Sequence, residues 1–254
     1  MKLVYLPLLA FLLFISTEIF SQDINSALSN KHVSGSVSIT NNGISLIPTF
    51  SLGKPALLSN IAYTKKKLSF EADINFANDG KPWFSLFWMR YKLVNQDKFT
   101  LRIGSHLGLN YKRVNLKTPV DSAQVLLCER YLVAEIAPNY QINKNFSVGI
   151  YYLFSHGLDY GTNNANHFLT LNSTISNISI GKELVLSLTP QIYFLKMDKN
   201  EGYYLTGAIK LAKRNSPFAL TSVFNKVINT EINPQDDFVY NFSLTYLFGN
   251  HKVF

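Results

Sequence analysis

The sequence predicts an all-β fold, an antiparallel up-and-down transmembrane β-barrel of about twelve strands. Three observations predict it: an N-terminal leader of secretory type, the near absence of helical periodicity, and a final segment, 238–248, with two contrasting faces. Alternate side chains of a strand lie on opposite faces. One face carries Phe238, Tyr240, Phe242, Leu244, Tyr246 and Phe248, and the other carries Val239, Asn241, Ser243, Thr245 and Leu247. A soluble sandwich also alternates, but strands this long with aromatic residues toward their ends favour the barrel.

Residues 1–21 resemble a signal peptide. Lys2 is the basic start, an uncharged apolar run covers 3–15, and a small residue, Ser21, precedes Gln22. The run is shorter than the roughly 20 residues that a membrane helix needs. An uncleaved anchor is the alternative. We expect cleavage near Ser21, a short periplasmic segment over 22–32, a barrel domain over 33–254, and location in the cell outer membrane.

Alternating segments separated by turn residues follow along the chain. The expected strands are 33–40, 44–52, 66–77, 82–94, 98–112, 124–140, 145–156, 166–180, 183–197, 202–213, 217–231 and 237–249. Asn, Gly, Asp and Pro lie between them and supply the backbone angles of turns. The segment 56–65 has no clear place in this scheme, and counts of ten or fourteen remain open.

Connection lengths suggest an orientation. With both termini on the periplasmic side, even-to-odd connections should be tight turns and odd-to-even connections longer outer loops. The turns near 95–97, 143–145, 181–182 and 214–216 are tight, and the connections 113–123 and 157–165 are long. The short outer connections 41–43 and 78–80 break this rule.

The formal net charge is +8, and Cys128 is the single cysteine, so no internal disulfide forms. Nucleic acid is not expected as the partner of an exported chain. The basic balance suits an anionic membrane surface or anionic solutes, unless Lys only solubilises turns and loops. No phosphate loop, zinc spacing or EF-hand pattern occurs, so we expect no cofactor and no metal.

The leader, the even number of strands, the tight turns and the aromatic final strand together resemble Gram-negative outer-membrane β-barrels. The segments 80–92 and 190–198 resemble uncharacterised barrels of Bacteroidetes, which carry no known activity. In this class the insertion machinery reads the final strand and its terminal aromatic residue. The resemblance therefore implies an insertion signal at Phe242, Leu244, Tyr246 and Phe248, with Phe254 as the other candidate for the terminal residue.

Charged residues fall on the inward register of four neighbouring strands. They are Glu71, Asp73, Arg90, Lys92, Arg102, His106, Lys112, Glu129 and Glu135. Facing lipid near the midplane, basic residues would each cost about 2–4 kcal/mol, so the polar register is the consistent place for them. They predict either a charged constriction that selects solutes or an internal salt-bridge network that fills a narrow barrel.

Pairing across strands suggests the selectivity. Glu71 and Asp73 should cancel Arg90 and Lys92 on the next strand. Lys67 and Lys210 add to the inward bases, which leaves Arg102, with His106 beside it, as the least neutralised base. We expect a weak preference for anions that deepens as His106 protonates.

Catalysis is not expected. Hydrolases built on such barrels place a His-x-Ser pair on one strand face, and this chain has only Ser105-His106 and Ser155-His156, whose members face opposite sides. His156, Asp159 and His167 flank the loop 157–165, where solvated residues are the simpler interpretation. Aromatic residues suit interfacial girdles, with a sugar-binding stack as the alternative for those that face inward. They are Trp83, Trp88, Tyr91, Tyr151, Tyr152, Tyr193, Tyr203, Tyr204, Tyr240 and Tyr246.

Three functional hypotheses follow. The first is a monomeric, narrow, passive pore for small polar or anionic solutes. The second is a structural or interaction barrel without transport, and the third is a lipid-modifying enzyme. The expected partners are outer-membrane lipids, the barrel insertion machinery and a small solute.

Overall fold

The computed structural model describes residues 31–117, 122–233 and 236–249. The chain divides into two compact units, Met1–Lys31 and His32–Phe254. The barrel belongs to the second. The predicted signal peptide, nearly all of the 22–32 segment and Phe254 lie outside the described residues. No helix in the described part of the chain is long and apolar enough to cross a bilayer.

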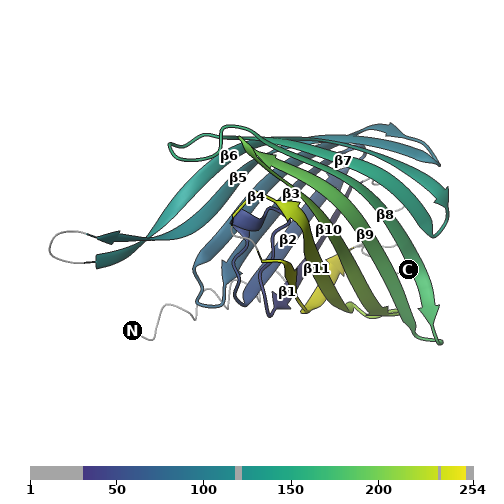
Figure 1. Cartoon of the computed structure of the whole chain (residues 1–254). Helices are drawn as coiled ribbons and strands as arrows, with labels where there is room; N and C mark the ends of the chain where they lie inside the picture. The colour runs from purple at the N-terminus through teal and green to yellow at the C-terminus, as the bar shows by residue number, and fades with distance from the viewer. Residues whose placement is uncertain (1–30, 118–121, 234–235, 250–254) are drawn as a thin grey trace. The chain divides into compact units, whose positions relative to one another are not determined.

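Strands make up almost all of the described residues, and they are shown in chain order in Figure 1. They are β1 (Lys31–Thr40), β2 (Ala56–Lys65), β3 (Leu68–Ala77), β4 (Pro82–Asn95), β5 (Phe99–Lys117), β6 (Ser122–Asn143), β7 (Phe146–Gly157), β8 (Asn166–Ile180), β9 (Leu184–Met197), β10 (Asn200–Lys213), β11 (Phe218–Thr230), β12 (Phe238–Tyr240) and β13 (Ser243–Gly249). A short 3-10 helix, η2 (Pro48–Phe50), lies between β1 and β2.

The sheet closes on itself. Each strand from β1 to β11 lies beside the next one in the chain, and β1 and β11 both pair with β13. The last strand is broken at Asn241 and Phe242, so β12 and β13 are two parts of one strand and the barrel has twelve. Ser38 Oγ and Thr245 Oγ1 lie 2.8 Å apart across the β1–β13 seam. The predicted fold class is confirmed.

The two faces of the wall also follow the prediction. On the last strand Phe238, Tyr240, Phe242, Leu244 and Tyr246 are between 44% and 63% exposed. Their neighbours Ser243 and Thr245 are 7% exposed and face inward. An apolar outer face around a polar interior is the reverse of a water-soluble sandwich and is typical of barrels that lipid surrounds.

Residues 44–52 do not form the predicted strand, although the predicted total of twelve strands is correct. Residues 41–55 form a long connection with η2 inside it, and the missing strand is β2 at 56–65. Pro48 has no N–H to donate to a sheet ladder, and it begins η2 in place of a strand. The connection 41–55 is therefore a long outer loop and not the short turn 41–43. The connection between β3 and β4 is short, as expected.

The remaining connections fit the predicted orientation. The end of the barrel that carries the start of β1 and the end of β13 also carries the tight turns 66–67, 96–98, 144–145, 181–183 and 214–217. The opposite end carries the loop 158–165 and the β5–β6 hairpin, which projects beyond the rest of the wall in Figure 1. By the rule for such barrels, this second end is the outer one.

The girdle prediction holds for only part of the aromatic set. Tyr91, Tyr203, Tyr240 and Tyr246 are 42–51% exposed on the outer face. Four others are turned into the barrel and buried: Trp83 (3%), Trp88 (6%), Tyr193 (1%) and Tyr204 (0%). Strand register decides which face each ring takes, and a bulge between β3 and β4 beside Trp83 shifts the alternation there.

Candidate functional site

The loop 41–55, named the inner loop, folds back into the barrel. Three backbone hydrogen bonds close its base: Gly43 N donates to Lys54 O at 2.8 Å, and Leu52 N and Gly53 N donate to Gly43 O at 2.9 and 3.2 Å. Gly53 has a φ of +66°, a conformation that favours glycine. The residues between these points form a closed lobe with η2 at its tip.

One side of the lobe rests on strands β8 to β10. The Tyr193 hydroxyl donates to the Leu46 carbonyl at 2.8 Å. Leu46 and Ile47 pack on an inward cluster whose members are 0–5% exposed. The cluster consists of Phe168, Tyr193, Leu195, Met197, Tyr204 and Ile232. Tyr193 and Tyr204, which the sequence assigned to a girdle, thus form part of the seat of the inner loop.

The tip of the lobe reaches strands β4 and β6. Trp83 Nε1 donates to the Phe50 carbonyl at 2.8 Å. The Phe50 ring lies 5.3 Å from the Tyr131 ring and packs against Trp88 and Val133. The inner loop therefore touches two separate parts of the wall and narrows the outer half of the lumen.

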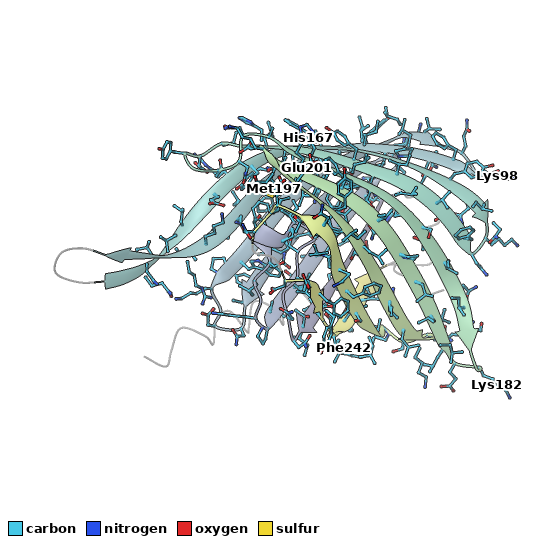
Figure 2. The ribbon with its side chains drawn as sticks, viewed as in Figure 1. Lys98, His167, Lys182, Met197, Glu201 and Phe242 are labelled. Atoms are coloured by element: carbon cyan, nitrogen blue, oxygen red, sulfur yellow. The ribbon has the colours of Figure 1, made fainter. Side chains whose placement is uncertain are left out.

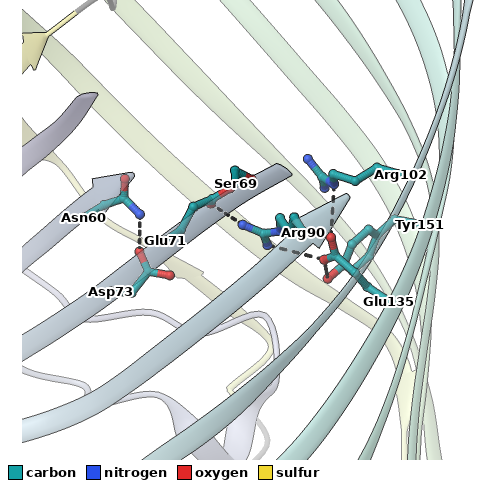
Figure 3. Close-up of polar contacts among 8 residues, drawn as sticks. All are labelled: Asn60, Ser69, Glu71, Asp73, Arg90, Arg102, Glu135 and Tyr151. Carbon is teal, nitrogen blue, oxygen red and sulfur yellow. Dashed lines mark hydrogen bonds and ion pairs between the residues drawn. The ribbon is translucent and has the colours of Figure 1, made fainter. Parts of the chain in front are cut away.

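Beside the loop, the buried carboxylate of Glu135 collects several partners (Figure 3). Its Oε1 accepts from Arg90 Nε at 2.9 Å and from Arg102 Nε at 3.0 Å, and its Oε2 accepts from the Tyr151 hydroxyl at 2.8 Å. The Glu135 side chain is 0% exposed. Arg90 also pairs with Glu71, and its guanidinium carbon lies 3.8 Å from the centre of the Trp88 ring. This is an internal network in which each charge has a partner.

A second ion pair lies nearer the outer end. Lys112 Nζ is 2.9 Å from Glu129 Oε1, and Glu129 Oε2 accepts from the Tyr131 hydroxyl at 3.1 Å. His106 is 7% exposed, and its ring lies 4.0 Å from that of Trp88. His106 thus faces the barrel interior but is packed away from open space.

Three details of the predicted pairing are wrong. Asp73 accepts from Asn60 Nδ2 at 2.7 Å, and no ion pair joins it to Lys92 among the described residues. Arg102 is bound to Glu135, so it is not the free base of the lumen. Lys67 lies in the turn between β2 and β3 and not on an inward face. Glu71 with Arg90 is the predicted pair that the structure contains.

The basic surplus of the chain lies mainly at the end with the tight turns. Figure 2 shows Lys98 and Lys182 there, and His167, Met197 and Glu201 at the other end. The bases at this rim are Lys31, Lys65, Lys66, Lys67, Lys98, Lys144, Lys182, Lys213 and Arg214, against the acids Asp97 and Glu183. A net charge of +8 therefore says little about the lumen.

The three candidate groups beside the loop 158–165 do not converge. Asp159 is held by Arg130, with Nη2 and Oδ1 2.6 Å apart. His167 Nδ1 is 2.8 Å from the Tyr152 hydroxyl, on the outer face. His156 bonds to the Asn164 carbonyl. No cluster of three metal-ligating side chains occurs in the described ranges.

Sequence reasoning missed the inner loop and the role of Glu135 as a common partner. Pro48 was only a weak signal for the first, because Pro138 and Pro190 lie inside strands of the same barrel. The second depends on the stagger of β4, β5 and β6, where Gly104 leaves room for the Arg90 and Glu135 side chains beside it. No local pattern encodes that stagger.

Comparison with solved structures shows the same fold in outer-membrane channels. The KdgM porin, in complex with disordered oligogalacturonate, matches with a TM-score of 0.53 and 10% identity over 85% of this chain and 99% of its own. The NanC porin matches with a TM-score of 0.51 and 10% identity, over 84% of this chain and 98% of its own. An outer-membrane channel from Pseudomonas putida F1 matches with a TM-score of 0.50 and 10% identity, over 90% of this chain and 100% of its own. No protein-family model and no curated protein matches.

Proposed function

We propose that this chain is an outer-membrane barrel that acts as a narrow, passive pore for small polar solutes. The observation that carries the proposal is the lining. The inward register is charged on β3 to β6 and carries small polar residues on β1 and β13, inside a wall whose outer face is apolar. The inward apolar residues of β8 to β10 form the seat of the inner loop. A barrel that only anchored a partner could be filled with apolar side chains instead.

The inner loop is the reason why we expect the pore to be narrow. It crosses the outer half of the lumen and is fixed by Tyr193 on one side and Trp83 on the other. In a barrel of twelve strands such a loop sets the limiting cross-section, because the wall itself cannot contract without breaking its hydrogen bonds. We therefore expect small single-channel currents.

The test is planar-bilayer recording of the refolded protein, compared with a variant in which residues 44–52 are replaced by a short Gly-Ser linker. The pore proposal expects small channel events from the unmodified protein and several-fold larger ones from the variant. Absence of events from both proteins, with folding confirmed by strand-type circular dichroism, would rule out a pore.

A structural barrel without transport is the second candidate. The tight seat of the inner loop favours it, since Tyr193, Leu195 and Tyr204 are at most 1% exposed beneath the loop. This candidate expects currents from the loop-replaced variant and none from the unmodified protein. The same recording therefore separates the two functions.

For insertion, we propose that the machinery reads the outward residues Phe242, Leu244, Tyr246 and Phe248. The exposure of Phe242, Leu244 and Tyr246 on the lipid side of the terminal strand supports this role, and Phe248 is half-buried on the same strand. Replacing Tyr246 and Phe248 with Ser should lower the amount of protein in the outer membrane, while the inward pair Ser243→Ala and Thr245→Ala should not.

A further inference from the structure

We infer that solutes pass the inner loop on one side only, through a cleft against β10, β11 and β12, and that this cleft selects uncharged, polyhydroxylated solutes about the size of one sugar ring. The inference rests on the proposed pore function. It names the route, the class of solute and the residue that opposes anions.

The first step is the position of the inner loop. Its apolar side chains Leu46, Ile47 and Phe50 are packed against the wall, as described above. The lobe leaves a cavity of about 260 Å³ between itself and the opposing strands. Asn42, Ser45 and Ser51 line it from the loop, Asn225 lines it from β11, and Asp236 lines it from the connection between β11 and β12. Apolar side chains such as Ile44, Leu52 and Val239 complete the lining, so the open space beside the loop has both polar and apolar walls.

The second step is the chemistry of this cleft. Amides and hydroxyls both donate and accept hydrogen bonds, so such a lining can replace the water around a hydroxylated solute. Asp236 is the single charged residue among those that line the cleft in the described part of the chain. Its negative charge repels anions that enter the cleft.

The third step is that the inward bases do not reach this charge: three of them are paired with carboxylates, and Lys210 on β10 lies six residues from Tyr204, toward the end with the tight turns. Arg90 and Arg102 share the carboxylate of Glu135, and Lys112 is held by Glu129. These pairs come from β4, β5 and β6, whereas the cleft wall comes from β10, β11 and β12. The anion preference expected from Arg102 is therefore replaced by discrimination against anions at Asp236.

Size gives the fourth step. Pockets for drug-sized ligands span about 300–1,000 Å³. A cavity of about 260 Å³ lies just below that range, which suits a single sugar ring or a smaller polyol and excludes a folded peptide.

Swelling of protein-containing vesicles in isotonic solute tests the selectivity. Glucose and glucuronate have nearly the same size and differ by one charge. We expect glucose to enter unmodified vesicles at least five-fold faster than glucuronate. Asp236→Lys should reduce this ratio to near one or below, and Arg102→Ser should leave it unchanged. Asp236 is exposed in a loop, so its replacement does not threaten the barrel.

Faster entry of glucuronate than glucose, or a ratio that follows Arg102 and ignores Asp236, overturns the inference while the pore stands. Entry of neither solute, together with silent bilayers, removes the pore itself and the inference with it. The two failures are therefore distinct.

A labelling experiment tests the route without relying on charge. In a Cys128→Ser background, Val239→Cys places a thiol in the cleft, and Ala137→Cys places one on the inward face opposite Arg102. A bulky thiol reagent on Val239→Cys should cut conductance by more than half, and the same label on Ala137→Cys should change it little. The reverse result would place the route on the β4–β6 side and overturn the inference.

Discussion

Phe50→Ala should loosen the inner loop from its seat and raise the conductance of the pore. Phe50 is half-buried against Tyr131, Trp88 and Val133. Truncation of a fully buried Phe costs about 3–5 kcal/mol, so the half-buried ring of Phe50 should contribute about 2 kcal/mol to seating the loop. Because each 1.4 kcal/mol is a factor of ten, the ratio of released to seated loop should rise about 30-fold.

Single-channel recording is the direct assay for this change. The variant should show more frequent or longer openings to a larger conductance level, close to that of the loop-replaced protein. Phe70→Ala is the matched control, because Phe70 is 47% exposed on the outer face of β3 and loses the same atoms without touching the loop. If Phe50→Ala and Phe70→Ala show the same conductance levels and opening frequencies, the inner loop does not limit conduction and the reasoning fails.

Three further outcomes can be measured. Glu135→Ala leaves Arg90 and Arg102 without their shared buried partner, so it should lower the free energy of unfolding by about 3–5 kcal/mol. Urea titration of the lipid-reconstituted protein measures this loss, and a loss under about 1 kcal/mol would contradict the network. Gly35→Ala sets a methyl group against the Phe248 ring at the β1–β13 seam and against the Asn60 carbonyl of β2. This should destabilise the closed barrel by about 1–3 kcal/mol and increase the unfolded band on unheated gels; an unchanged band would refute this. Hydrogen bonding to Arg130 holds the pKa of Asp159 below its usual value, so the anchoring of loop 158–165 should persist at neutral pH and be lost as pH falls below about 4. Hydrogen exchange of the loop should show this loss, and Asp159→Asn should remove its pH dependence.

The sequence alone determined the class of fold and the faces of most strands. The alternation from Phe238 to Phe248 identified an apolar outer face, since a period of two is a local property of the extended chain and survives in any sheet that the strand joins. The same property placed Glu71, Arg90, Arg102 and Glu135 on the inner face.

Only the tertiary structure decided what those inward residues meet. Residues 44–52 alternate like a strand, yet their apolar side chains pack against inward aromatic rings and not against lipid. Local alternation cannot distinguish these two apolar surroundings. The partners of Glu135 depend in the same way on the stagger between neighbouring strands, which backbone hydrogen bonds and bulges set across the whole barrel. The cleft beside the inner loop follows from that packing, because Leu46, Ile47 and Phe50 hold the loop against other parts of the wall.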